Sequence, residues 1–131
     1  YYYTDIGLRN ARLNYRQYDP GHIMENIIYN ELLRRGYSVD VGVVTDRTGG
    51  ANVQKEIDFV VNDADKKIYI QSAYRMNTDK KESSELASLI LTKDFFKKII
   101  VRMDISHNFY DDYGIFHCNL IDLLLGRVEL I

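Results

Sequence analysis

The strongest constraint on the fold is a segment with clear signals for the start and the end of a helix. Asp19 is a good N-cap, and Pro20 suits the first helical position, where a backbone N–H is not needed. Gly36 suits the end of the helix. The apolar residues that recur every four positions are Met24, Ile28 and Leu32. This spacing predicts an amphipathic helix over residues 20–35.

Alternating apolar residues follow this helix and predict strands. Residues 37–44 are rich in β-branched side chains and predict a first strand, and 45–52 contain Gly49-Gly50 and predict a loop. The runs 56–61 and 67–73 alternate on either side of a predicted turn at 62–66. We expect these two runs to form a β-hairpin, with Ile57, Phe59 and Val61 on one face of it.

The second half of the chain adds alternating helical and extended segments. We predict a helix over 82–91 with Leu86, Leu89 and Ile90 inward, and a buried central strand over 97–103. A loop at 106–113, a strand at 115–118 and a short helix at 119–125 complete the chain, and Gly126 suits the end of that helix. Residues 1–18 contain a further short helix. The predicted class is α/β, a mixed β-sheet flanked by helices in the order α-β-β-β-α-β, followed by a strand and a helix.

Composition narrows the class of protein. The 131 residues suit one domain, and 46% hydrophobic with 27% charged residues is typical of a globular domain. The net charge of −2 excludes a strongly basic nucleic-acid protein but leaves a local basic patch possible. The single Cys118 excludes an intramolecular disulfide framework, and the scattered His22, His107 and His117 offer no closely spaced zinc ligands. Without a long apolar segment or a signal peptide, a cytoplasmic location is expected.

The predicted hairpin brings polar residues together. If its turn is symmetric about residues 64 and 65, Asp58 lies opposite Gln71 and Glu56 lies opposite Ala73, all on one face. Glu25 lies at the edge of the apolar stripe of the preceding helix and can lean toward the sheet. Two carboxylates and an amide oxygen are ligands that Mg²⁺ or Mn²⁺ accepts. An ordinary exposed cross-strand pair and a solvated first-turn glutamate are the alternative interpretations.

The order of a helix glutamate, a strand aspartate and a strand with [E/D/Q]-x-K resembles the PD-(D/E)xK, restriction-endonuclease-like fold. Several stretches are similar to one branch of it, the nuclease-like C-terminal domain of unknown function that follows the ATPase module in prokaryotic AAA-type ATPases. These stretches are Tyr3-Thr4-Asp5-Ile6-Gly7-Leu8-Arg9-Asn10, Met24-Glu25-Asn26-Ile27-Ile28-Tyr29-Asn30-Glu31-Leu32 and Glu56-Ile57-Asp58-Phe59-Val60. The similarity covers nearly the whole chain.

The resemblance implies site residues and a domain context. Glu25 matches the helix glutamate, Asp58 the strand aspartate and Gln71 the second acidic position, whereas Ala73 occupies the lysine position. Lys80 and Lys81 follow in the next segment. Residues 1–131 would form one C-terminal domain, and 1–18 would join it to an upstream ATPase module. ATP would bind only in that module, since the chain contains no G-x-x-x-x-G-K-[ST] phosphate loop. The chain begins without Met, so we expect it to be a piece of a larger protein.

Three functions follow from these expectations. The first is a non-catalytic or degenerate nuclease-like accessory domain that contacts its own ATPase module, another protein or DNA, and that could form homo-oligomers. The second is a metal-dependent DNA nuclease that uses Glu25, Asp58 and Gln71 on Mg²⁺ or Mn²⁺, with Glu56 as a source of further charge. The third is a DNA-binding module without cleavage, whose binding would weaken steeply with salt.

Overall fold

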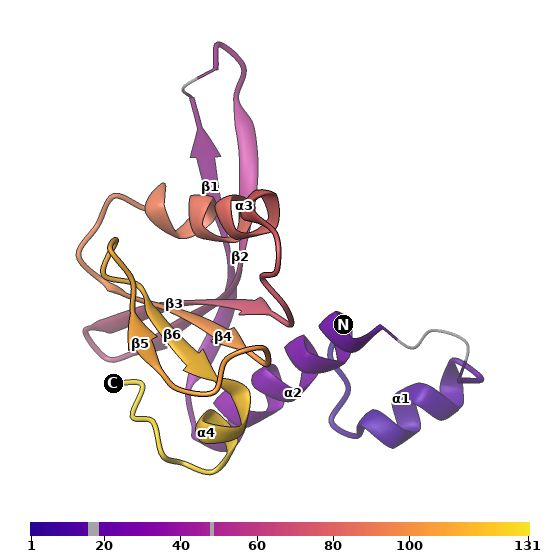
Figure 1. Cartoon of the computed structure of the whole chain (residues 1–131). Coiled ribbons are helices and arrows are strands. Elements are labelled where there is room, and N and C mark those ends of the chain that lie inside the picture. The colour runs from indigo at the N-terminus through magenta and orange to yellow at the C-terminus, as the bar shows by residue number, and fades with distance from the viewer. Residues whose placement is uncertain (16–18, 48) are drawn as a thin grey trace.

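The structure is a computed structural model that describes residues 1–15, 19–47 and 49–131. A sheet of six strands forms its centre, with helices on both faces (Figure 1). The helices are α1 (Ile6–Arg12), α2 (Pro20–Arg34), α3 (Asp79–Ile90) and α4 (Leu120–Leu124). The strands are β1 (Ser38–Asp46), β2 (Val53–Asp63), β3 (Lys66–Ala73), β4 (Lys97–Arg102), β5 (Phe109–Tyr110) and β6 (Phe116–Asn119). The predicted α/β class and order of elements are confirmed.

The sheet is mixed, with the strand order β1-β2-β3-β4-β6-β5. The first three strands form antiparallel pairs, β3-β4 and β4-β6 are parallel, and β5 is antiparallel to β6. The parallel pairing of β3 and β4 requires a crossover, which α3 provides. The strand that begins at Lys97 is therefore central, and its apolar run Ile99-Ile100-Val101 is fully buried, as predicted.

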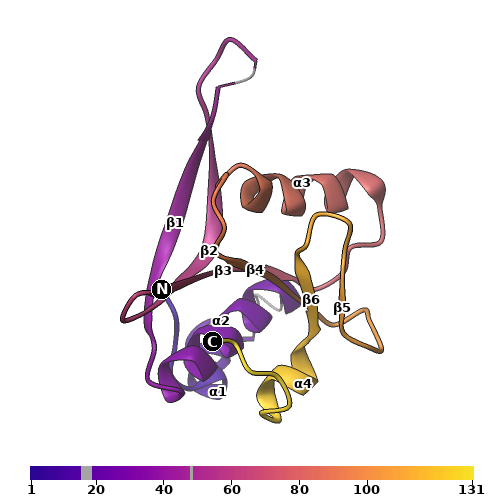
Figure 2. The same cartoon turned by 90° about the vertical axis from the view of Figure 1, so that its left-hand side faces the viewer.

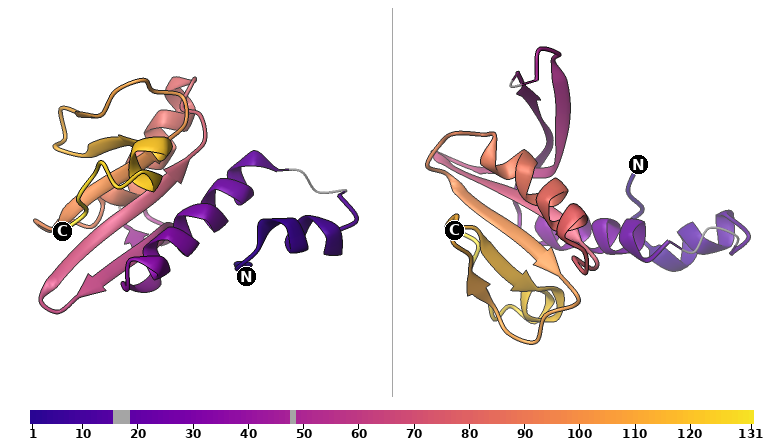
Figure 3. Two further views of the ribbon diagram at one scale, coloured as in Figure 1. Left: turned by 90° about the horizontal axis from the view of Figure 1, so that it is seen from below. Right: turned by 45° about the horizontal axis from the view of Figure 1, so that its top comes forward.

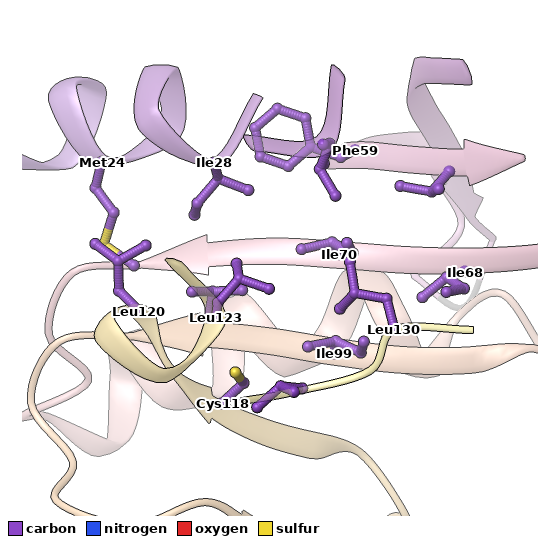
Figure 4. Packing of buried hydrophobic residues seen from close by; sticks show 14 residues of the cluster. Met24, Ile28, Phe59, Ile68, Ile70, Ile99, Cys118, Leu120, Leu123 and Leu130 are labelled. Carbon is purple, nitrogen blue, oxygen red and sulfur yellow. The ribbon is translucent and has the colours of Figure 1, made fainter. Parts of the chain in front are cut away.

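Helix α2 covers one face of the sheet and α3 covers the other (Figures 1 and 2). The larger apolar cluster lies on the α2 face, where Met24 and Ile28 pack against Phe59 and Ile70, and Leu123 of α4 completes it (Figure 4). Apolar residues of α3, including Leu86 and Leu89, form a second cluster on the opposite face. Helix α1 extends away from the sheet beyond α2 (Figure 3).

The signals for helix ends are confirmed. The side chain of Asp19 accepts a hydrogen bond from the backbone N–H of Gly21 at 2.9 Å, and Gly36 has a φ of +84° just after the end of α2. Helix α4 likewise begins after Asn119 and ends before Gly126, which has a φ of +70°. Of the segment 1–18, in which a short helix was predicted, residues 16–18 lie outside the described residues. None of the helices in the described ranges is long and apolar enough to cross a membrane.

Several predicted boundaries and faces were wrong. β1 runs to Asp46 and so enters the predicted 45–52 loop, and β2 (Val53–Asp63) begins before and ends after the predicted run 56–61. The predicted loop at 106–113 contains the short strand β5. Helix α3 begins at Asp79, because Thr78 accepts a hydrogen bond from the N–H of Lys81 and caps it. Ile90, expected to point inward, is 42% exposed because it lies at the end of α3 beyond the buried residues of that helix.

A β-bulge interrupts the pairing of β1 with β2. Asp40 pairs with Val60, but Gly42 pairs with Ile57, so Asp58 and Phe59 together oppose a single residue of β1. The bulge reverses the alternation, and Ile57 therefore packs in the α3 cluster while Phe59 packs in the α2 cluster. The expectation that Ile57 shares the face of Phe59 was wrong for this reason.

A half-buried arginine, Arg35, connects the C-terminal segment to α2. Arg35 donates to Glu31 Oε1 at 2.7 Å, to the carbonyl of Leu123 at 2.5 Å and to the carbonyl of Val128 at 3.1 Å. Its side chain is 15% exposed, whereas that of Arg34, which binds the same glutamate, is 67% exposed. Two arginines thus share one carboxylate, but only Arg35 bridges distant parts of the chain.

We predict that Arg35→Ala lowers the free energy of unfolding by about 2–4 kcal/mol, because it removes the donor to the carbonyl groups of Leu123 and Val128 and leaves Glu31 paired with Arg34 alone. Arg34→Ala is the matched control and should lower the free energy of unfolding much less, since the Arg34 side chain is exposed. Urea denaturation of both variants measures the difference. Equal losses would contradict the assigned role of Arg35.

Candidate functional site

The candidate site lies where the β2-β3 hairpin meets the bulge. Phe59 pairs with Ile70, and the following pairs run to Asp63 and Lys66, which is the register predicted from a turn symmetric about residues 64 and 65. The two turn residues are Ala64, with a φ of +54°, and Asp65. Asp58 and Gln71 come next along this register, immediately beyond the last of these backbone pairs.

Side chains take over the hydrogen bonding where the paired backbone ends. Oδ2 of Asp58 accepts a bond from the backbone N–H of Ser72 at 2.7 Å. Oε1 of Gln71 accepts one from the backbone N–H of Asp58 at 3.3 Å, and Nε2 of Gln71 donates to Oε2 of Glu85 at 2.9 Å. Gln71 therefore connects β2 to α3, and both ends of its amide are engaged.

The bulge changes which predicted site residues share a face. Ile57 and Ala73 lie in the cluster beneath α3, so Glu56, which precedes Ile57, points to the opposite face. The prediction of one face for Glu56, Asp58, Gln71 and Ala73 was therefore wrong, because it assumed uninterrupted alternation. Asp58 and Gln71 nevertheless contact each other through the bonds described above.

Glu25 approaches the site from α2. Its side chain is 28% exposed, and its Oε2 lies 3.8 Å from Nδ1 of His22. Burial raises the pKa of the Glu25 carboxyl, while His22 opposes this shift. Tyr2 covers the same region and stacks on Tyr29 of α2 with ring centroids 4.4 Å apart. Burial, and then the charges of Glu25 and Asp58, raise the pKa of Tyr2 to about 12.

Asp58 is the most perturbed carboxyl of the site. Burial first, together with the charges of Glu25, Glu85 and Glu56, raises its pKa from 3.8 to about 7, against the lowering effect of the Ser72 N–H. Several carboxylates in a partly buried space disfavour one another's charge. At neutral pH the protonated form of Asp58 is therefore substantially populated.

A hollow of about 190 Å³ lies beside these residues. Its lining includes Glu25 and His22 of α2, Ser72 and Ala73 of β3, and Lys81 and Glu85 of α3. Ala73, at the position where the resemblance implies lysine, is 2% exposed and packs in the α3 cluster. Lys81, which the sequence analysis names together with Lys80, lines this hollow and brings an ammonium group to it.

The donor atoms do not form a ready metal site. Within the ranges that the structure describes, no group of three or more His, Cys, Asp or Glu side chains is placed to hold a metal ion. The amide of Gln71 is engaged at both ends, and one oxygen of Asp58 accepts the Ser72 N–H. In this arrangement Gln71 and one oxygen of Asp58 are thus engaged within the protein, and binding of Mg²⁺ or Mn²⁺ by Glu25, Asp58 and Gln71 stays a prediction.

Sequence reasoning missed Glu85 as a member of the site. It lies on α3, one turn after Lys81, and its carboxylate accepts a hydrogen bond from the side-chain amide of Gln71. The available signal was its spacing in the sequence. Glu85 precedes Ser88 by three residues and Leu89 by four, and both of these are buried, so Glu85 lies near the inner face of α3. That signal could have indicated a residue close to the sheet, but it does not distinguish Gln71 from its neighbours as the partner.

Comparisons with known proteins support a family assignment. Residues 20–119 match the family described as "Domain of unknown function (DUF4143)". A curated relative, an uncharacterized protein of Haemophilus influenzae, is 37% identical over 101 residues, which are 77% of this chain and 22% of that protein. The chain therefore spans about a fifth of the length of this relative.

A solved structure is similar at a lower level. It is a refined half-complex from the tetradecameric assembly of Thermococcus gammatolerans McrB AAA+ hexamers with bound McrC. The TM-score is 0.48 at 12% sequence identity, over 77% of this chain and 27% of that chain. This similarity is too low to establish a shared fold.

We predict that Asp58→Asn changes how stability depends on pH. The folded pKa of about 7 lies above the ordinary 3.8, so the folded state holds an extra proton between these values. The stability that this proton provides is complete below about pH 4 and is lost as the pH rises to about 7. The free energy of unfolding of the unsubstituted chain should therefore fall between pH 4 and pH 7 by about 2–4 kcal/mol more than that of Asp58→Asn. Urea denaturation at several pH values measures this difference.

Asp104→Asn provides a control of opposite sign. Hydrogen bonds from Arg102 hold the pKa of Asp104 at about 2, below its ordinary value of 3.8. Its contribution to stability is therefore present above about pH 4 and lost as the pH falls toward 2. Stability curves of Asp58→Asn and the unsubstituted chain that run parallel from pH 4 to 7 would contradict the assignment for Asp58.

Proposed function

Since this chain belongs to the DUF4143 family, we propose that it is a non-catalytic accessory domain of a larger AAA-type ATPase. In this proposal the domain has a restriction-endonuclease-like ancestry. Asp58 and Gln71, at the positions of its former catalytic residues, now connect the β2-β3 hairpin to α3. Its function is to contact the ATPase module or a further partner.

The observation that carries this proposal is the use of the site residues in internal hydrogen bonds. Gln71 joins Asp58 to Glu85, and Asp58 binds the N–H of Ser72. Ala73 is buried among apolar side chains and cannot replace the lysine that would stabilise charge on a phosphate. In this proposal these residues stabilise the fold, and position 73, where the resemblance implies a lysine, supplies no positive charge for phosphodiester cleavage.

The accessory role is supported by length and by exposed apolar residues. The curated relative is several times longer than the matched segment, so that segment is one part of a larger protein there. In this chain Leu8 on α1 and Tyr15 just after it are 68% and 75% exposed. Helix α1 extends away from the sheet, which makes these side chains available to a neighbouring module (Figure 3).

We predict that the chain forms a stable complex with the ATPase module, or changes its rate of ATP hydrolysis, when the two are co-expressed. Leu8→Asp should weaken this association by at least about tenfold, because it places a charge in an apolar contact. Leu125→Asp is the control, since Leu125 is 59% exposed just after α4. Absence of both a complex and a rate change would count against the accessory role.

A metal-dependent nuclease is the second candidate. The observation in its favour is that Lys81 lines the same hollow as Glu25, Glu85 and Ala73. An ammonium group there would stand in for the missing strand lysine, close to the carboxylates on which the charge of Asp58 depends. In this case Lys81 would stabilise charge on a phosphate, which is the role that lysine has in such sites.

We predict that the chain does not nick supercoiled plasmid in the presence of Mg²⁺ or Mn²⁺, because the site residues are engaged with one another. The assay compares the unsubstituted chain with Asp58→Ala and Lys81→Ala on agarose gels, after circular dichroism has shown that all three are folded. Nicking by the unsubstituted chain, lost in both variants, would establish the nuclease and overturn the non-catalytic proposal.

A further inference from the structure

The outer edge of β1 has no neighbouring strand. β1 is nine residues long and pairs with β2 on one side only, and no other strand in the described part of the chain pairs with it. The opposite edge of the sheet is β5, which has only two residues. The backbone N–H and C=O groups along a long edge strand are a ready template for another strand.

Two residues that usually protect such an edge, lysine and proline, are absent from β1. Val41 and Val43 of this strand are 60% and 56% exposed. The β1-β2 arm also projects beyond α3, so its outer side is not covered by a helix (Figures 1 and 2). A projecting apolar edge of this kind is typical of an interaction surface.

The exposed valines lie on one face of the arm. Val39 packs against the α2 cluster, and side chains alternate along a strand, so Val41 and Val43 share its side of the sheet. Val44, on the other side, packs against the α3 cluster. The apolar surface is thus a short row on the α2 side of β1.

The sequence of β1 is complementary to a second copy of itself in one antiparallel register. Gly42 is the middle residue of the strand, and pairing centred on Gly42 uses all nine residues. It places Val41 opposite Val43 of the second copy, and Asp40 opposite Val44. Centring the pair on Val43 instead would place Asp40 opposite Asp46 of the second copy, and facing carboxylates are unfavourable.

We propose that two copies of this chain associate through their β1 edges, antiparallel and centred on Gly42, to form one continuous sheet. The association satisfies backbone groups of both edges and buries the four exposed valines against one another. It is isologous, because each copy contributes the same surface, and it closes after two copies.

Analytical ultracentrifugation of the 131-residue chain tests the proposal. We expect a dimer at about 100 μM that dissociates on dilution. Val41→Lys should raise the dissociation constant by at least about tenfold, because it places an ammonium group among the paired valines. Val53→Lys is the matched control, since Val53 is 51% exposed on β2, away from the outer edge, and should leave the dimer intact.

A cysteine pair tests the register. The double variant Val41→Cys with Val43→Cys should give a cross-linked dimer on mild oxidation, since these positions face each other between copies. Val43→Cys alone should not, because it faces Val41 of the second copy. A chain that is monomeric at about 100 μM, or a dimer that Val41→Lys leaves unchanged, would overturn the proposal.

Discussion

The β-bulge at Asp58 and Phe59 is the constraint on which the rest of the site depends. One extra residue in β2 lets Ile57 pack under α3 while Phe59 packs under α2. Both faces of the sheet are thus supplied with apolar side chains by neighbouring residues of a single strand. Asp58 lies between these two packed positions, which explains why a carboxyl group is held in a space of low polarity.

Next to the bulge, the β1 position that pairs with Ile57 has no room for a side chain. A Cβ atom at Gly42 would lie 2.7 Å from Cγ2 of Val60 and 3.1 Å from Cβ of Ile57, which is closer than a side chain tolerates. The two strands therefore approach closely only because Gly42 has no side chain. On the other side of β2, the backbone pairing with β3 ends at Phe59 and Ile70, and the side chains of Asp58 and Gln71 replace it.

Much of the fold could be predicted from the sequence because its signals are local. Asp19, Pro20 and Gly36 mark the ends of α2, and the symmetric turn at 64 and 65 fixed the hairpin register. The bulge was not predicted, since alternation was assumed to continue, although an isolated glycine within a strand is a known indication of one. The position of Glu85 could not be obtained in the same way. It depends on how α3 is rotated against the sheet, which is set by packing of distant residues.

The contacts of Arg35 have a consequence for the order of events during synthesis. Its carbonyl partners lie 88 and 93 residues further along the chain. While the ribosome is still adding β3 and β4, α2 can already form, but this guanidinium has no carbonyl groups to bind and must remain hydrated. Docking of α2 onto the sheet therefore reaches its final form only after the segment around Val128 has emerged. Folding of this domain is completed late in translation, although its best-defined helix is made early.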